Sequence, residues 1–449
     1  MEELLNVSPI DGRYYKKTHV LENYFSEYAL IKNRVFVEIK WLLFLASKKF
    51  IFELKDQDKN KINSIIENFN IDEAKKVKEI EKTTNHDVKA VEYYLREKFT
   101  SLGLGNFTSY IHIFLTSEDI NNTSYNLMIK TCLEDVYFKQ IQDLIANLKE
   151  KSLKYKDVAM LSHTHGQVAT PTTVGKEFKV FEYRLEKIFK RIKEIKLCSK
   201  FGGAVGNFNC HIVAYPNINW EDLAKEFICS IGLEYNPVST QIESHDTICL
   251  LLSFVKLLNC VIKDLNSDMW LYISKGYFKE KIKNNEVGSS VMPHKVNPIN
   301  HENSMANIEI CNGIIDVLTT NLPVSRMQRD LSDSSKMRNI GVVFAHSLIS
   351  VSETIKGLNK IEVNTQEISE ELDNNYEVLA EAIQTILRKN KVENGYEMLK
   401  SLTRGKKITK IDMQEFVSTL QIDENDKRTL LNLSPNKYVG LAEKIVENN

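Results

Sequence analysis

Glycine and proline are scarce in this sequence, at 17 and 8 of 449 residues. Because strand-rich folds need frequent tight turns, this scarcity argues against an architecture of many short strands and favours long helices. The chain is also far longer than one small core requires, so length alone predicts two or three domains. We therefore expect a large, mainly helical protein.

Paired cysteines and a dominant charge are absent as well. The formal net charge of −1 argues against nucleic acid or an anionic membrane as the main partner, but it leaves room for a local pocket that binds one small anion. No CxxC pair occurs, so we expect neither a disulfide framework nor a zinc site, and scattered thiols are typical of a cytosolic protein. Residues 1–6 lack a basic region followed by an apolar run, so no secretory signal is expected. The seven cysteines are Cys132, Cys198, Cys210, Cys229, Cys249, Cys260 and Cys311.

Long apolar runs are rare, and the one at 248–262 is short for a membrane span. Lys256 interrupts it, and Lys263 and Asp264 close it. A helix that is apolar on all sides is normally buried. We predict that this segment lies inside a domain or at an interface between subunits.

Apolar residues recur at helical spacing in several segments, which predicts an all-α fold of long packed helices. The pattern is clear at 30–46, 137–148 and 340–355. It is longest in a stripe formed by Phe178, Phe181, Leu185, Ile188, Ile192 and Ile195.

Composition divides the chain into three zones, which we interpret as three domains. Residues 1–115 mix helices with polar loops and form an N-terminal helical domain. Residues 116–364 contain the longest helices and form a central long-helix bundle domain. Residues 365–449 have shorter, more charged helices and form a small C-terminal helical domain.

The most polar loop of the sequence is 288–298, which reads GSSVMPHKVNP. Lys295 can hold a carboxylate, and Ser289 or Ser290 can act on a proton. Pro298 suits the first turn of a following helix with Asn297 as its N-cap, which would place the end of the loop at an anion-favouring helix N-terminus. The alternative is an ordinary surface loop before a capped helix.

A second polar cluster is 161–171, which reads LSHTHGQVATP. His163 and His165 alone do not make a metal site, because no Asp, Glu or Cys nearby completes a ligand set. An acid–base histidine fits better, since imidazole titrates near neutral pH. The alternative is a turn before a helix, with Thr170 as cap and Pro171 in the first turn.

Two further clusters also have capping as their alternative. In 83–89, TTNHDVK, Asp87 either orients His86 or caps a helix that begins at Val88. In 115–122, LTSEDINN, the polar residues either bind a ligand or form an N-cap with an acidic first turn.

Positive charge is concentrated at Arg326, Arg329 and Arg338, around the serine-rich stretch 332–335. Arginine with serine suits a phosphate, because the guanidinium donates in pairs and hydroxyls donate as well. The stretch 11–14, DGRY, adds one more arginine beside an aromatic ring. The glycine-rich stretch 202–207 is not a P-loop, because it lacks the Lys-Ser/Thr ending.

Together these clusters resemble the adenylosuccinate lyase family of the fumarase/aspartase superfamily. The superfamily signature Gly-Ser-Ser-x-Met-Pro-x-Lys-x-Asn is present at 288–297, while the family is indicated by TNHDV at 84–88 and THGQ at 164–167. The resemblance is to the bacterial-type long form and runs from about residue 8 to 406. It implies a three-domain, all-α fold with a twenty-helix central bundle in a homotetramer, whose active sites are shared between subunits.

The resemblance also implies a reaction and a set of site residues. The family releases fumarate from adenylosuccinate, giving AMP, and from the succinylocarboxamide imidazole ribotide of purine synthesis, without a metal or organic cofactor. Ser289 matches the general base and His165 the general acid. The other matched positions bind substrate: Arg13, Tyr14, Asn85, His86, Asp87, Thr116, Ser117, Gln241, Ser290, Lys295, Val296, Asn297, Asn303, Arg329, Ser334 and Arg338.

Two alternatives stay open from the sequence. One is another fumarate-releasing lyase of the superfamily, of the argininosuccinate lyase type, against which the His-Gly-Gln stretch and the arginine–serine cluster argue. The other is a catalytically silent helical scaffold, which would predict loss of positions such as Ser289 and His165. Small-molecule substrates in the cytoplasm, with no nucleic acid or membrane partner, are the expectation.

Overall fold

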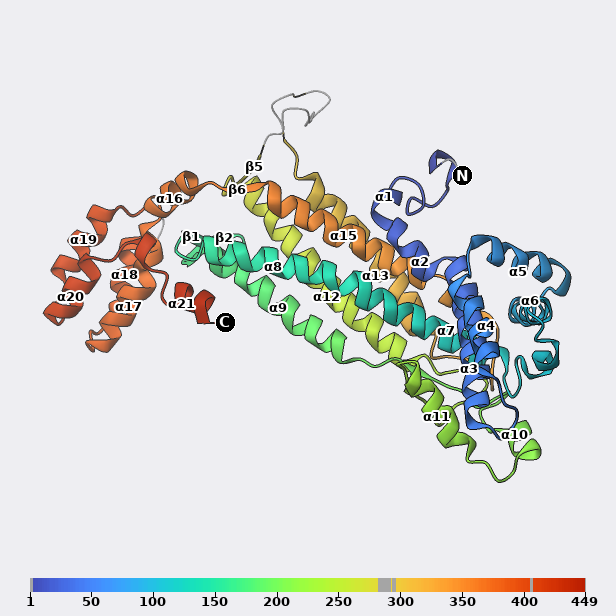
Figure 1. The fold of residues 1–449 in the computed structure, drawn as a ribbon. Coiled ribbons are helices and arrows are strands. Elements are labelled where there is room, and N and C mark those ends of the chain that lie inside the picture. The colour runs from blue at the N-terminus through green and yellow to red at the C-terminus, as the bar shows by residue number, and fades with distance from the viewer. Residues whose placement is uncertain (1–2, 282–291, 293–295, 404–406, 449) are drawn as a thin grey trace. The chain divides into compact units, whose positions relative to one another are not determined.

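The computed structural model describes residues 3–281, 292, 296–403 and 407–448, and it is built almost entirely from helices (Figure 1). The predicted all-α fold class is confirmed. Among these residues, no helix is both long enough and apolar enough to cross a membrane.

The helices before the first strand are η1 (Glu3–Leu5), α1 (Tyr15–Thr18), η2 (His19–Leu21), α2 (Glu22–Phe25), α3 (Glu27–Lys48), α4 (Asp56–Glu67), α5 (Ile71–Thr84), α6 (Asp87–Ser101), η3 (Gly105–Tyr110), α7 (Ser117–Cys132), the π-helical η4 (Leu133–Tyr137) and α8 (Phe138–Lys154). Those that follow, as far as the end of the long helices, are α9 (Val174–Glu194), α10 (Asn209–Ala214), α11 (Trp220–Ser230), α12 (Asp246–Ser274), α13 (Ile299–Asn321), α14 (Ser332–Met337) and α15 (Ile340–Lys360). The last are α16 (Thr365–Asp373), η5 (Tyr376–Leu379), α17 (Ala380–Lys389), α18 (Gly395–Thr403), α19 (Lys410–Thr419), α20 (Glu424–Leu431), η6 (Pro435–Lys437) and α21 (Ala442–Asn448).

Strands within the described residues form short two-stranded sheets. An antiparallel hairpin pairs β1 (Ala159–Thr164) with β2 (Gln167–Thr173). A parallel pair joins β3 (Cys198–Ser199) and β4 (Glu234–Tyr235), and an antiparallel pair joins β5 (Phe278–Glu280) and β6 (Ile361–Val363).

The chain divides into two compact units that are not consecutive in sequence. Unit 1 comprises Met1–Ile141, Ile188–Asn259 and Ala306–Ser350, and unit 2 comprises Gln142–Lys187, Cys260–Met305 and Val351–Asn449. The division falls within α8, α9, α12, α13 and α15. The three consecutive domains expected from composition stay a prediction.

The core of unit 1 is built around α3, which packs on α4 and α7, while α5 packs on α6 (Figure 1). Trp41 of α3 is 2% exposed and meets Phe201 and Phe227 edge-on, at ring-centroid distances of 4.9 and 5.1 Å. Such aromatic contacts add to the free energy gained by burial. They also fasten the segment after β3 and the helix α11 to α3.

The predicted apolar stripes face the interior. In α9, Phe178, Leu185 and Ile192 are at most 1% exposed, and in η4 and α8, Tyr137 and Ile141 are fully buried. The pattern of three and four residues therefore located the buried faces of these helices correctly.

Unit 2 contains a buried polar contact among the long helices. Asn266 of α12 donates from Nδ2 to Thr354 Oγ1 at 2.8 Å and to Ser304 Oγ at 3.2 Å. Its Oδ1 lies 2.7 Å from Nδ1 of His301. Because a buried polar group must find a partner, this network fixes how α12, α13 and α15 meet in unit 2.

Candidate active site

In unit 1, Thr116 and Ser117 lie at the start of α7, as predicted for a capped helix with an acidic first turn. The Thr116 N–H donates to Asp119 Oδ2 at 2.8 Å. Asp119 Oδ1 accepts from the Gly202 N–H at 3.1 Å and pairs with Lys200 Nζ at 2.8 Å. The N-terminus of α7 is thereby joined to the glycine-rich stretch 202–207.

Arg329 is held from two sides in unit 1. Its Nη2 lies 2.9 Å from Glu118 Oε1, and its Nη1 donates to Gln241 Oε1 at 3.4 Å. Gln241 is fixed in turn by donating to the Ala204 carbonyl at 3.0 Å. Among the described residues Arg329 Nε is buried without a hydrogen-bond partner. Since such a donor costs about 1 to 3 kcal/mol when unsatisfied, the position favours an acceptor brought by an anionic ligand.

Ser334 lies in α14, close in sequence to a buried carboxylate. Asp333 Oδ1 accepts from the Ser334 N–H at 2.7 Å, and Asp333 Oδ2 lies 3.8 Å from Nε2 of His245. Burial raises the pKa of Asp333, but His245 and Arg329 outweigh it and hold that pKa below its usual value. His245 is 3% exposed and has a left-handed φ of 63°. The first turn of α14 is therefore contacted by His245, which lies far from it in sequence.

Arg338 follows α14 and shares a carboxylate with the buried Arg34. Arg338 Nη2 lies 3.3 Å from Asp87 Oδ2, and its Nη1 lies 2.6 Å from Glu27. Arg34 Nη2 lies 2.6 Å from the same Asp87 oxygen. Burial raises the pKa of Asp87, yet the two arginines lower it overall. Asp87 is therefore a carboxylate that orients two guanidinium groups.

The stretch around Asp87 differs from the capping alternative. The helix α6 begins at Asp87, and its N-cap is His86, whose Nδ1 accepts from the Lys89 N–H at 3.1 Å. Asn85 precedes it in a left-handed conformation, with φ of 50°, and ends α5. The expectation that Asp87 caps a helix from Val88 is wrong, because the imidazole takes that place and leaves Asp87 to the arginines.

Arg13 and Tyr14 lie in unit 1 just before α1. Arg13 is exposed, and Tyr14 is the half-buried N-cap residue of α1. Lys17 Nζ lies 5.4 Å from the centroid of the Tyr14 ring. Both residues precede α1, whereas Arg329, Ser334 and Arg338 lie in and beside α14.

In unit 2, His165 lies at the tip of the β1–β2 hairpin. His165 and Gly166 have φ of 53° and 75°, between the paired residues Thr164 and Gln167. Positive φ at both positions is the geometry of a two-residue hairpin turn. The alternative of a turn leading into a helix capped by Thr170 is therefore wrong. The turn leaves the imidazole exposed.

The signature loop is described only in part. Ser289, Ser290 and Lys295, expected as base and substrate contacts, lie outside the described residues. Val296 is described and is 37% exposed.

Asn297 and Asn303 belong to unit 2, and α13 begins between them, at Ile299. The Pro298 carbonyl accepts from the Glu302 N–H at 3.3 Å, so Pro298 immediately precedes the helix rather than lying in its first turn. The helix thus starts one residue later than predicted, and Asn297 is not its N-cap. Asn303 is half-buried in the first turns of α13.

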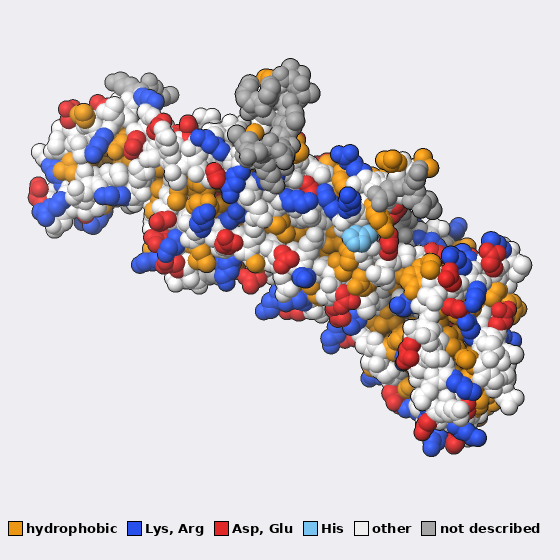
Figure 2. Space-filling view, turned by 45° about the horizontal axis from the view of Figure 1, so that its top comes forward, with side chains coloured by type: hydrophobic (Ala, Val, Ile, Leu, Met, Phe, Trp, Pro, Cys, Tyr) orange, Lys and Arg blue, Asp and Glu red, His pale blue; other side chains and the backbone are white. Residues whose placement is uncertain are grey.

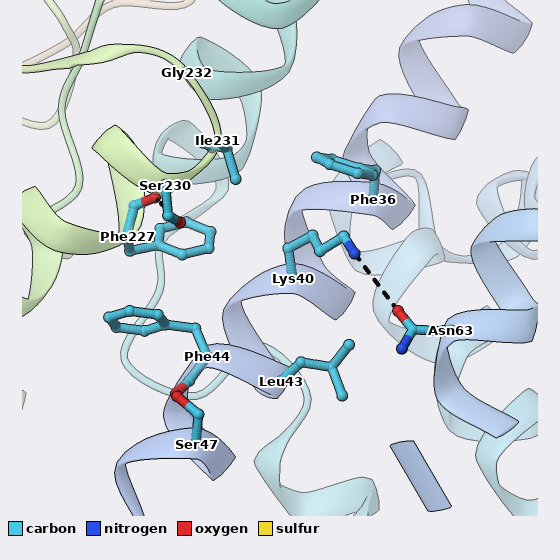
Figure 3. A pocket seen from close by; sticks show the side chains of 10 residues that line it. All are labelled: Phe36, Lys40, Leu43, Phe44, Ser47, Asn63, Phe227, Ser230, Ile231 and Gly232. Carbon is cyan, nitrogen blue, oxygen red and sulfur yellow. Dashed lines mark hydrogen bonds between the residues drawn. The ribbon is translucent and has the colours of Figure 1, made fainter. Parts of the chain in front are cut away.

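A separate cavity of about 680 Å³ lies in unit 1 among α3, α4 and α11 (Figure 3). Phe36, Phe44 and Phe227 line it, and Lys40 donates to Asn63 Oδ1 at 3.5 Å across one side. Its described lining includes none of the side chains singled out from the sequence. On the face drawn in Figure 2, basic and acidic side chains are intermixed, in agreement with the net charge of −1.

Sequence reasoning missed Arg34, and it included the supporting residues Glu118 and Asn121 only as members of the polar stretch 115–122. All three are buried, with exposed fractions of 1%, 4% and 8%. One signal was visible: Arg34 interrupts an apolar helical stripe, and α7 opens with a polar run too long for a cap alone. Charged or amide side chains at core positions indicate a buried polar network.

Comparisons with known proteins first identify the class of protein to which the chain belongs. Residues 12–313 match the family model described as Lyase. A fumarate lyase from Mesorhizobium sp. BNC1 superposes with a TM-score of 0.76 at 19% identity, covering 96% of this chain and 97% of that one. A 3-carboxy-cis,cis-muconate lactonizing enzyme from Pseudomonas putida gives 0.75 at 18% identity, covering 96% of each. The chain has the fold of the fumarase/aspartase superfamily of lyases.

A second family model and the full-length relatives identify the particular family. Residues 325–439 match the family model described as Adenylosuccinate lyase C-terminal. The adenylosuccinate lyase of Buchnera aphidicola subsp. Schizaphis graminum is 47% identical, over 100% of this chain and 99% of that protein. The Escherichia coli K12 enzyme of the same name is 44% identical over the same shares. The chain belongs to the adenylosuccinate lyase family.

Proposed function

We propose that this chain releases fumarate by β-elimination from adenylosuccinate, giving AMP, and from the succinylocarboxamide imidazole ribotide of purine synthesis. Full-length similarity to adenylosuccinate lyases supports the reaction. The structural observation that carries the substrate class is Arg329, whose buried Nε has no acceptor among the described residues while Glu118 and Gln241 hold its other nitrogens. A phosphorylated nucleotide supplies such an acceptor.

The reaction needs a base, an acid and groups that stabilise negative charge. A proton passes from the succinyl carbon to Ser289, and the C–H electrons form the new C=C bond of fumarate. The C–N bond breaks, its electrons go to the purine amine nitrogen, and that nitrogen takes a proton from His165. Negative charge that builds on the succinyl carboxylate is held by fixed protein groups, with Lys295 and Asn297 as the proposed pair.

The two catalytic roles make different demands on the chain. A serine hydroxyl has a pKa far above neutral, close to that of water, so Ser289 needs its alkoxide stabilised, for which Lys295 is the proposed cation. His165 needs a fixed position and access to substrate, and an exposed side chain on a tight hairpin turn supports both.

The remaining expected residues divide between the two halves of the substrate. Thr116, Ser117 and Gln241 are proposed to bind the succinyl part, and Ser290, Val296 and Asn303 are proposed as further substrate contacts. Arg13, Tyr14, Arg329, Ser334 and Arg338 are proposed to contact the nucleotide. Asn85, His86 and Asp87 complete the proposed site.

We further propose a cytoplasmic homotetramer with shared active sites. Apolar side chains that single-chain packing leaves exposed support an assembly: Leu250 and Leu257 on α12, and Ile310 and Val317 on α13, are 51%, 48%, 51% and 57% exposed. Each pair is seven residues apart, so each pair forms a stripe along one face of its helix. A methyl group added at Gly313 would meet nothing within 4 Å. Such faces favour burial against another subunit.

Fumarate release by the purified chain tests the reaction directly. We expect turnover with adenylosuccinate and none with argininosuccinate. The reaction is monitored by the ultraviolet absorbance of the double bond of fumarate. The matched variant Ser289→Ala should fold and lose turnover. Release from argininosuccinate alone would assign the chain to the other lyase type, and no release from either would contradict catalysis.

A further inference from the structure

We propose that Arg34 is a positioning residue, which sets the placement of Arg329 and Arg338 relative to each other. The inference rests on the proposed function, in which these two arginines contact the nucleotide. Arg34 itself is 1% exposed and lies within α3, so any effect it has on a ligand must act through its neighbours.

A continuous chain of polar contacts joins the two outer arginines through Arg34. From Arg329, Glu118 lies at 2.9 Å, and Asn121 Nδ2 donates to the same Glu118 oxygen at 2.7 Å. Arg34 Nε donates to Asn121 Oδ1 at 2.9 Å, and Arg34 Nη2 lies 2.6 Å from Asp87. Asp87 lies 3.3 Å from Arg338, which completes the path.

The contacts that Arg34 makes with Asn121 and Asp87 require an arginine side chain. Nε and Nη2 lie on one edge of the planar guanidinium, and here that edge meets an amide oxygen on α7 and a carboxylate at the start of α6. A lysine ammonium is a point charge on a flexible stem and does not present two donors at a fixed angle. Arg34 therefore couples the positions of α6 and α7 through one rigid group on α3.

Charge balance strengthens the same conclusion. Three arginines, Arg34, Arg329 and Arg338, alternate with three carboxylates, Glu118, Asp87 and Glu27. Without Arg34, Asp87 keeps only one of its two arginine partners, and Asn121 Oδ1 loses the donor that orients the amide toward Glu118. Because binding groups must be held within about half an ångström of their productive positions, both ends should lose alignment together.

The test compares Arg34→Met with Arg34→Lys in the full-length enzyme. We expect Arg34→Met to raise the KM for adenylosuccinate about tenfold, with a smaller change in kcat. Inhibition by AMP should weaken by a similar factor, while inhibition by adenosine, which lacks the phosphate, should stay as in the wild type. Arg34→Lys keeps charge and volume but not the paired donors, so it should show the same selective loss to a smaller degree.

A double-mutant cycle separates positioning from general stability. If Arg34 acts through Arg338, then Arg34→Met should raise KM far less when Arg338→Met is already present. The matched control is Arg96→Met, which removes an arginine of the same unit that pairs with buried Glu92 at 2.7 Å. It should leave KM and AMP inhibition unchanged.

Three outcomes would overturn the inference: folded Arg34 variants with wild-type KM, equal weakening of AMP and adenosine, or full additivity with Arg338→Met. If Arg34→Met does not fold, Arg34→Lys decides by the same three criteria. A wild-type enzyme that releases no fumarate from adenylosuccinate would instead contradict the proposed function, so the two failures are distinguishable.

Discussion

Lys200 and Asp119 form an ion pair of 2.8 Å in which both side chains are 0% exposed. Lys200 Nζ also donates to the Gly203 carbonyl at 2.6 Å. A charge buried this deeply is tolerable only because its partner and the backbone satisfy it. The pair therefore ties the start of α7 to the stretch that holds Gln241.

Replacing Lys200 should destabilise the folded protein. We expect Lys200→Met to lower the free energy of unfolding by about 3 to 5 kcal/mol, because Asp119 would stay buried without a counter-ion. The control is Lys48→Met, which breaks the half-exposed pair with Glu226 and should cost less than about 1 kcal/mol. Urea unfolding of the two variants measures both; equal losses would contradict the argument.

Acid should weaken the fold through His301. Burial lowers the pKa of His301 to about 4, whereas the unfolded chain takes up the proton near pH 6.5. The unfolded state then binds more protons between these values, so stability present above pH 6.5 is lost as pH falls toward 4, by up to about 3 kcal/mol. Unfolding free energies measured from pH 7.5 to 4 should decrease less steeply in His301→Gln.

The control for this effect is His19→Gln, because His19 is exposed. We expect its pH dependence to match the wild type. The buried His211, whose pKa is also lowered to about 4, remains in both variants and keeps part of the slope. An unchanged slope in His301→Gln would show that His301 is not responsible.

His165→Asn separates chemistry from backbone geometry. Asparagine tolerates a left-handed φ better than most residues, so the hairpin turn should survive and the melting temperature should stay near that of the wild type. If His165 is the general acid, kcat should fall by about 100- to 10,000-fold. Steady-state kinetics measure the loss of activity, and thermal unfolding checks that the fold is retained. Full activity in the asparagine variant would show that His165 is not the general acid.

Shared active sites predict complementation between inactive variants. When Ser289→Ala and His165→Asn subunits are mixed, dissociated and allowed to reassemble, some sites should contain neither substitution, and fumarate release should reappear. Each variant reassembled alone should stay inactive. Absence of recovery in confirmed mixed oligomers would mean that both residues of a site come from one subunit.

Assembly should depend on the exposed apolar stripes. Introducing charge with Leu257→Lys together with Val317→Lys should shift the protein to smaller species in sedimentation velocity, because desolvating two lysines in an interface is unfavourable. Ile71→Lys also replaces an exposed apolar residue, 54% exposed, away from those stripes. It should leave the sedimentation coefficient unchanged; an intact tetramer in the double variant would place the interface elsewhere.

The helices were predictable because their signal is local. Stripes such as Phe178 to Ile192 repeat every three or four residues, and burial followed that repeat. The β1–β2 hairpin was not predicted. His-Gly is an unusual pair for its two-residue turn, and Pro171 within β2 favours a turn or a helix start over a strand.

The polar network around Arg34 could not be predicted from the sequence, for a different reason. Arg34 meets Asp87 and Asn121 across 53 and 87 residues of sequence, so no local pattern pairs them. The motifs indicated side chains suited to binding a substrate, such as Arg329 and Asp87. They contained no information about which buried groups hold those side chains in place.

Unit 1 is built from three separate segments of the chain, and this limits when it can fold during synthesis. Because its last segment is Ala306–Ser350, unit 1 cannot be completed until roughly three quarters of the chain has been made. At about 5 to 20 residues per second, the ribosome needs roughly 20 to 70 s to reach that point. During this time Glu27 of α3 and Glu118 of α7 lack Arg338 and Arg329, so the polar network of unit 1 can be completed only after that point.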